Sequence, residues 1–166
     1  MRKTLFAIAT VCACAVAAEA AAQPVSIDRK QVSAAAARKM VDACLAFAEK
    51  NNAVVAVAVV DISGVLIDFH AMQGGTATTA ETAILKAKTA AHWQRSTTAL
   101  EADVLRDGGN KAPLWVGDFP KAGALPIVID GQVAGAIGVG GPKFQEECAQ
   151  AGIDAVIPKP PVAAAR

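Results

Sequence analysis

The sequence is poor in the side chains that most often bind metals or stack on flat ligands. It has 166 residues but no tyrosine, two tryptophans and two histidines. The absence of tyrosine excludes a phenolate as a metal ligand. Lysine and arginine number 16 against 15 aspartates and glutamates, without any basic stripe, so a nucleic-acid partner is not expected.

Long apolar runs are also missing, although apolar types make up 54% of the chain. No uninterrupted stretch reaches the length that a membrane-spanning helix needs. The N-terminal segment instead has the layout of a secretory signal: Arg2 and Lys3, an apolar stretch over 5–18, and small residues at 18–20 or 20–22. We predict that residues 1–22 are a signal peptide, that the protein is periplasmic or secreted, and that no membrane span remains after cleavage.

Only two of the four cysteines remain after the predicted cleavage, because Cys12 and Cys14 lie in the apolar stretch. Cys44 and Cys148 form neither a CxxC motif nor a zinc pattern, which disfavours metal binding through sulfur. In an oxidising compartment they are candidates for a disulfide. The alternative is that each is a small buried apolar residue on its own helix.

The hydrophobic pattern predicts a single mixed domain over residues 26–157. A helix capped by Ser26 or Asp28 is followed by a strand over 54–60, which is apolar on both faces like a central strand. Residues 65–70 then form the second strand of a hairpin.

Two capping boxes, which start at Thr78 and Thr98, predict two further helices. The first of these helices carries a row of small apolar residues that allows close approach to a sheet. Segment 107–125 is rich in Gly and Pro and predicts a long loop, with a brief strand over 114–116; loops of this length are often functional. The remaining predictions are a hairpin of strands over 126–129 and 133–139, a last helix with Pro142 at its first position, a short strand over 155–157, and a disordered tail over 158–166.

The order helix, two strands, one or two helices, two or three strands, helix resembles the profilin-like arrangement, an α+β fold with helices packed on an antiparallel sheet. Five segments in the same order are similar to the motifs of the GlcG/HbpS family, whose relatives include the C-terminal domain of PduO-type proteins. They are VVDISGVL at 59–66, Met72 with Gly74, KAKTA at 86–90, GALP at 123–126 and GAIGV at 135–139.

The resemblance implies a small oligomeric binding protein, since some members of the family bind, sense or degrade haem outside the cell. We therefore expect a homo-oligomer that binds haem or a related flat cofactor. The chain departs from the family at Ala71 and Gln73, where Arg and Asp are common, and at Gly140 and Glu146, where Ser and Asp are usual. If that Arg and that Asp contact the ligand in relatives, this protein binds a less polar ligand or binds it differently.

The two histidines are the first candidates for a haem ligand, because the iron needs a nitrogen or sulfur donor. His70 ends the second strand beside a glycine loop. His92 lies near the end of the second helix, where the helix dipole explains a histidine equally well. Met72 is a softer candidate that is also typical of a core gap. The aromatic side chains that can wall a flat ligand, or instead cover the sheet or a subunit interface, are Trp93, Trp115 and Phe119.

The glycine-rich segments and one lysine are further candidate ligand contacts. Gly138, Gly140 and Gly141 precede the last helix, and their amides can contact an anion or simply allow a tight turn. Gly74 lies in the loop before the second helix. Lys86 can pair with a ligand carboxylate or act as a base in a desolvated pocket, although exposure to solvent is the commoner fate of a lysine.

An alternative function is that of an enzyme acting on a small carboxylate or carbonyl compound in a catabolic pathway, with a pocket formed by the loop 74–79, Lys86 and the glycine turn. No Ser-His-Asp spacing, HExxH run or Walker motif assigns a catalytic residue. A third possibility is an oligomeric interaction module with apolar subunit contacts. The site predictions require that His70, Lys86 and Gly140 frame one pocket.

Overall fold

A computed structural model of the protein describes residues 26–157; the predicted signal peptide 1–22 and tail 158–166 lie outside these residues. Four strands form one antiparallel sheet in the order β2-β1-β4-β3. The elements are α1 (Ala34–Lys50), β1 (Ala56–Asp61), β2 (Leu66–Ala71), α2 (Ala77–Trp93), α3 (Thr97–Leu105), α4 (Ala112–Trp115), β3 (Ala124–Ile129), β4 (Gln132–Gly140) and α5 (Gln145–Asp154).

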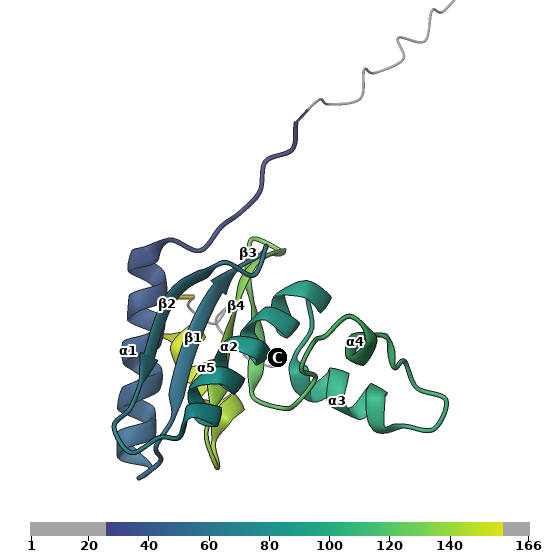
Figure 1. Cartoon of the computed structure of the whole chain (residues 1–166). Coiled ribbons are helices and arrows are strands. Elements are labelled where there is room, and N and C mark those ends of the chain that lie inside the picture. Colours follow the sequence, from purple (N-terminus) through teal and green to yellow (C-terminus); the bar gives the residue numbers. More distant parts are fainter. Residues whose placement is uncertain (1–25, 158–166) are drawn as a thin grey trace, which may run out of the picture.

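Helices cover both faces of this sheet, which confirms the predicted α+β fold. Helices α1 and α5 pack on one face and α2 packs on the other. Figure 1 shows α3 and α4 extending away from the sheet on the side opposite to α1. None of the helices within residues 26–157 combines the length and apolarity that a bilayer crossing requires.

Strand β1 separates two apolar cores, one on each side of the sheet. Val57 and Val59 pack toward α1 and α5, whereas Ala56, Ala58 and Val60 pack toward α2. All five side chains are fully buried, which confirms the prediction of a strand covered on both faces. Burial of each valine contributes about 2 kcal/mol of transfer free energy, so this strand is a main source of stability.

Helix α2 approaches β4 closely because both surfaces are built from very small residues. Ala83 and Ala87 of α2 are fully buried. A Cβ atom added to Gly138 of β4 would lie 2.5 Å from the Ala87 backbone nitrogen, and one added to Gly140 would collide with the backbone of Thr79. Only glycine allows this approach. The close approach to β4 fixes the position of α2, and with it the candidate residues Lys86 and His92.

A disulfide between Cys44 and Cys148 joins the two helices on the opposite face, α1 and α5. Both cysteines are buried, and they are separated by 104 positions in the sequence. A bond that closes so long a loop restricts the unfolded chain strongly. Of the two alternatives that the sequence left open, the structure contains the disulfide, and it anchors α5 to the core.

The predicted helix caps were wrong in position. Ser33, Thr76 and Ser96 are the residues whose side chains accept a hydrogen bond from the first turns of α1, α2 and α3. Neighbouring hydroxyl and carboxylate side chains are almost equally good caps, so tertiary packing decides which one is used. The residues predicted in their place were Ser26 or Asp28, Thr78 and Thr98.

Two predicted strands are not strands in the structure, where the sheet consists of β1 to β4. Residues 114–116 lie in and just after the short helix α4, and residues 155–157 form a turn after α5. Pro142 lies in a bend before α5 and not at its first position. The helix follows Phe144, whose φ is +57°.

Candidate functional site

The end of α2 and the segment before β3 build a hydrogen-bonded cluster around one buried carboxylate. Asp118 contacts His92 Nδ1 at 3.0 Å and accepts a hydrogen bond from Trp93 Nε1 at 2.7 Å. The Asp118 side chain is 7% exposed, whereas that of His92 is 50% exposed. Phe119 N–H donates to Thr89 Oγ1 at 2.8 Å and ties the same segment to α2. The bonds from His92 and Trp93, together with the bond between Phe119 and Thr89, therefore fix the position of the Asp118 carboxylate.

This contact determines which nitrogen of His92 is available. An ionised carboxylate only accepts hydrogen bonds, so in a neutral His92 imidazole that donates to Asp118 the proton is on Nδ1 and the lone pair on Nε2. Nε2 lies over the β1–β2 turn, where a Cβ added to Gly64 would be 3.3 Å from it. Val65 and Leu66 beside that turn are 61% and 43% exposed. Leu66 pairs with Val60 of the α2-side core, so it lies on the same face of the sheet as His92.

His70 lies on the other face of the sheet. It pairs with Val57 of the α1-side core, and cross-strand partners share a face. Asp68, two residues earlier, forms an ion pair with Arg38 of α1 at 2.8 Å, which places this face toward α1. The sheet therefore separates His70 from Lys86 on α2, and the hypothesis of one pocket that contains both is wrong.

Three of the predicted ligand contacts are packing residues in the structure. Met72 packs against the α1-side core. Gly138 pairs with the strands on both sides of β4, and α2 covers it. Gly140 is covered by α2 in the same way. Backbone that is paired in the sheet and pressed against a helix has no room for a ligand.

Gly74 and Gly141 do come together, in a cleft of about 410 Å³. The loop before α2 forms one wall, and Val54 with the turn after β4 forms the other. Gly141 has a φ of +153°, and a Cβ added there would lie 3.0 Å from the carbonyl oxygen of Val54. None of the lining residues is titratable. The cleft therefore offers shape and backbone groups to a ligand but no charge.

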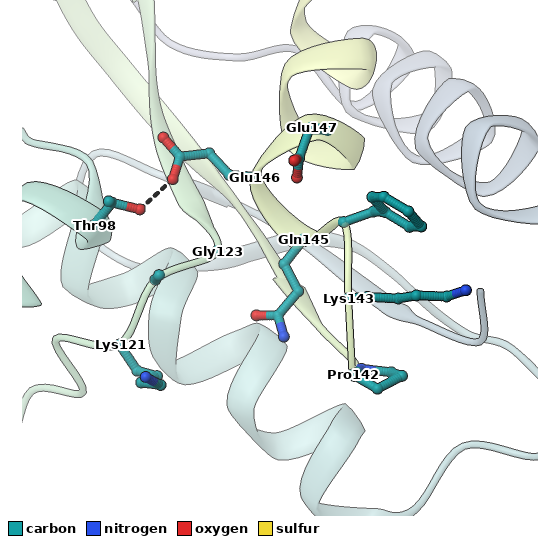
Figure 2. Close-up of a pocket in the computed structure, with 10 residues that line it drawn as sticks. Thr98, Lys121, Gly123, Pro142, Lys143, Gln145, Glu146 and Glu147 are labelled. Carbon is teal, nitrogen blue, oxygen red and sulfur yellow. Dashed lines mark hydrogen bonds between the residues drawn. The ribbon is translucent and has the colours of Figure 1, made fainter. Parts of the chain in front are cut away.

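A second cavity, of about 460 Å³, lies where α5 begins, and we call it the lysine pocket. Its walls are residues 121–123, residues 142–147 and Thr98. Figure 2 shows the Gln145 side chain extending into this space and Glu146 bonded to Thr98. Gln145 Oε1 accepts a hydrogen bond from Lys86 Nζ, which also donates to the Val139 carbonyl at 3.2 Å.

Lys86 is 3% exposed, so the expectation that solvent surrounds it is wrong. It lies on the buried face of α2, three residues after Ala83 and four before Ala90. Its amine reaches the Val139 carbonyl of β4 and the Gln145 side chain of α5.

Charges near this amine change its acidity. Burial and the nearby charge of Lys121 lower the pKa of Lys86 from 10.5 to about 8, while Glu101 acts in the opposite direction. Burial alone would raise the pKa of Glu101, but hydrogen bonds from Lys121 and from the Ala122 N–H lower it. A substantial fraction of Lys86 is therefore a neutral amine near physiological pH, as a base or a nucleophile requires.

Sequence reasoning missed Asp118 and Gln145. Asp118 lies in the segment 107–125, whose length had marked it as functional, but its partner His92 is 26 positions away. Gln145 is the first residue of α5, 59 positions from Lys86. Patterns in a short stretch of sequence do not reveal contacts between residues so far apart. The length of the predicted loop 107–125 was a signal for Asp118, and Gln145 had no comparable signal.

Comparison with known proteins supports the fold. The family model described as "Haem degrading protein HbpS-like" matches residues 32–154. Klebsiella pneumoniae protein ORFY, of the family DUF336, has a similar structure, with a TM-score of 0.76 and 24% identity over 83% of this chain and 99% of that one. No curated protein sequence matches the chain.

Two further solved structures are similar. A double mutant of HbpS from Streptomyces reticuli has a TM-score of 0.72 and 28% identity, over 82% of this chain and 98% of that one. A complex of PduOC with haem has a TM-score of 0.72 and 22% identity, over 76% of this chain and 96% of that one.

Proposed function

Because the chain belongs to the HbpS-like family, we propose that it binds haem and that the imidazole of His92 ligates the iron. The observation that carries this proposal is the contact of His92 with the buried carboxylate of Asp118. It holds the proton on Nδ1 and leaves the lone pair of Nε2 beside the β1–β2 turn at Gly64. The likeness to HbpS and to the PduOC–haem complex supports the ligand.

The residues around His92 suit a haem iron better than a bare metal ion. Within the described part of the chain, no three His, Cys, Asp or Glu side chains converge on one point. A porphyrin brings its own nitrogens and needs only axial ligands from the protein. The exposed side chains of Val65 and Leu66 offer apolar contact to a flat ring. Bound haem would supply redox and gas-binding chemistry; His92 holds the iron and Asp118 orients the imidazole.

His70 and His92 are alternative ligands, because the two histidines lie on opposite faces of the sheet. One chain therefore cannot ligate one iron through both. Among residues 26–157, the contacts of His70 include no carboxylate that would orient its ring, whereas His92 has Asp118. Replacing each histidine separately is therefore a direct test of which one ligates the iron.

The test is a titration of the purified protein with hemin, followed at the Soret band. We expect saturable binding by the wild type and by His70→Ala, and loss of the ligated spectrum in His92→Ala. Added imidazole is expected to restore the spectrum of His92→Gly, because the missing side chain was half exposed and leaves an accessible space. A spectrum that changes in His70→Ala and not in His92→Ala would refute the ligand assignment, and absence of saturation in the wild type would refute haem binding.

The proposal includes export from the cytoplasm. It is supported by the sequence of residues 1–22 and by the disulfide between Cys44 and Cys148, a bond that suits an oxidising compartment. N-terminal sequencing of the protein recovered outside the cytoplasm is expected to begin just after residue 22. A chain that keeps Met1 and stays in the cytoplasm would contradict it.

The proposal also includes a homo-oligomer. The α3–α4 region carries four exposed apolar side chains of the kind that copies of a chain bury against one another. Light scattering is expected to give a multiple of the chain mass, and Trp115→Ser is expected to give a smaller species; a monomeric wild type would refute self-association. The four residues and their exposed fractions are Leu105 (74%), Leu114 (51%), Trp115 (85%) and Val116 (69%).

A further inference from the structure

The lysine pocket contains a buried amine that haem binding does not use. Lys86 and His92 lie on one helix but point about 120° apart, one toward the sheet and one toward solvent. The acceptors of Lys86 Nζ are a backbone carbonyl and an amide, Val139 O and Gln145 Oε1. No ion pair joins Lys86 to a carboxylate among residues 26–157. Lysines are rarely buried to this extent without a charged partner, because burying an unpaired ammonium is costly.

One side chain separates this amine from the cavity. Gln145 lines the lysine pocket and bonds to Lys86 with its oxygen and to the Gly141 carbonyl with its nitrogen. Its place depends on Gly123, because a Cβ added there would lie 2.9 Å from Gln145 Cβ. Gln145 is the first residue of α5 and lines the cavity while Lys86 does not, so the Gln145 side chain is the group that must turn aside to admit a ligand to the Lys86 amine.

We propose that Lys86 is a nucleophile that forms an imine with a small aldehyde or ketone admitted to the lysine pocket. The neutral amine attacks the carbonyl carbon, so a C–N bond forms and a carbinolamine results. Both amine protons then leave with the carbonyl oxygen as water, and a C=N bond remains. The step needs no oxidant or reductant. The site is independent of haem, so its test and the hemin titration can fail separately.

The surroundings favour the neutral amine that this step requires. Burial and Lys121 lower the pKa of Lys86 from 10.5 to about 8, so its neutral fraction near neutral pH is far larger than that of an ordinary lysine. Glu101 opposes this effect but is bound to Lys121 and to the Ala122 N–H. The other charged groups around the cavity belong to the start of α5 or precede it: Lys143, Glu146 and Glu147.

The experiment is reductive trapping. The purified protein is incubated with glyoxylate, or with propionaldehyde as an uncharged probe, in the presence of cyanoborohydride, and adducts are located by peptide mass mapping. We expect a mass increase equal to the carbonyl compound minus one water plus two hydrogens, on Lys86 before any exposed lysine. Preference for glyoxylate would show that the pocket selects an oxo acid, and equal rates would show that it takes the carbonyl group alone.

Three variants make the result decisive. Gln145→Ala is expected to speed labelling of Lys86 several-fold, Lys86→Met to remove the adduct, and Lys88→Met, which changes a half-buried lysine on the same helix, to leave it unchanged. Labelling of Lys86 in the wild type is read directly from the peptide map, so the test stands even if Lys86→Met does not fold. Adducts only on exposed lysines, or a Lys86 that is labelled no faster in Gln145→Ala, would overturn the proposal.

Discussion

Replacement of Gly138 by alanine tests the packing that positions both candidate sites. The added Cβ would lie 2.5 Å from the backbone nitrogen of Ala87 and 2.9 Å from its Cα, and closer still to the carbonyl oxygen of Ala83. These are backbone atoms of α2, which cannot rotate away as a flexible side chain can. Overpacking a core costs 1–3 kcal/mol in typical cases, and we expect Gly138→Ala at the upper end, about 3 kcal/mol.

The assay is urea denaturation followed by circular dichroism, with the disulfide intact. A loss of about 3 kcal/mol corresponds to a fall of about 10 °C in Tm for a domain of this size. Gly75→Ala is the matched control. Neither glycine has a positive φ, so alanine restricts both unfolded chains equally. The nearest atom to a Cβ at Gly75 is the Met72 carbonyl oxygen at 3.3 Å, so this variant is expected to change stability by less than about 1 kcal/mol.

Helix α2 must move if Gly138→Ala folds at all, and it carries Lys86 and His92 with it. We therefore expect weaker hemin binding and a changed rate of Lys86 labelling in this variant, and neither change in Gly75→Ala. A Gly138→Ala protein as stable as the wild type would refute the close contact of α2 with β4, and with it the placement of both sites.

Three further predictions follow from single interactions. Asp118→Asn removes the negative charge that favours the proton on His92 Nδ1 and turns one of the two acceptor oxygens into an NH2 donor, so hemin affinity measured by Soret titration is expected to fall by about 10- to 100-fold; an unchanged affinity would separate Asp118 from the site. Lys86 has a folded-state pKa below that of the unfolded chain, so its unfavourable burial is fully felt below about pH 8 and is relieved as pH rises toward 10.5. Stability of the wild type relative to Lys86→Met, from urea denaturation, should rise between pH 7 and 9.5 by about 2 kcal/mol, and a fall would contradict the buried amine. Replacement of Cys44 and Cys148 together by alanine opens a loop of 104 positions and is expected to cost about 4 kcal/mol in urea denaturation; an equal stability of the two proteins would mean that the bond does not constrain the unfolded chain.

Much of the fold was predictable because its signals are local. A β-branched run apolar on both faces predicted β1. The predicted hairpin over 126–139 is β3 and β4, joined at Asp130 and Gly131, which both have a positive φ. A row of small residues predicted the close approach of α2 to the sheet. Each signal depends on the backbone preferences or the periodicity of one segment, which the order of residues contains in full.

The candidate site was decided by tertiary structure. Alternate residues of a strand share a face, so Asp68 and His70 of β2 do, but only the direction in which the hairpin packs shows that this face meets α1 and that His92 lies on the other side. Lys86 is buried because α2 turns it toward the sheet. Asp118 and Gln145 meet their partners across 26 and 59 positions. Helical and strand periods report which side chains share a face of one element; which elements meet, and across which side chains, depends on how the whole chain minimises its exposed apolar surface.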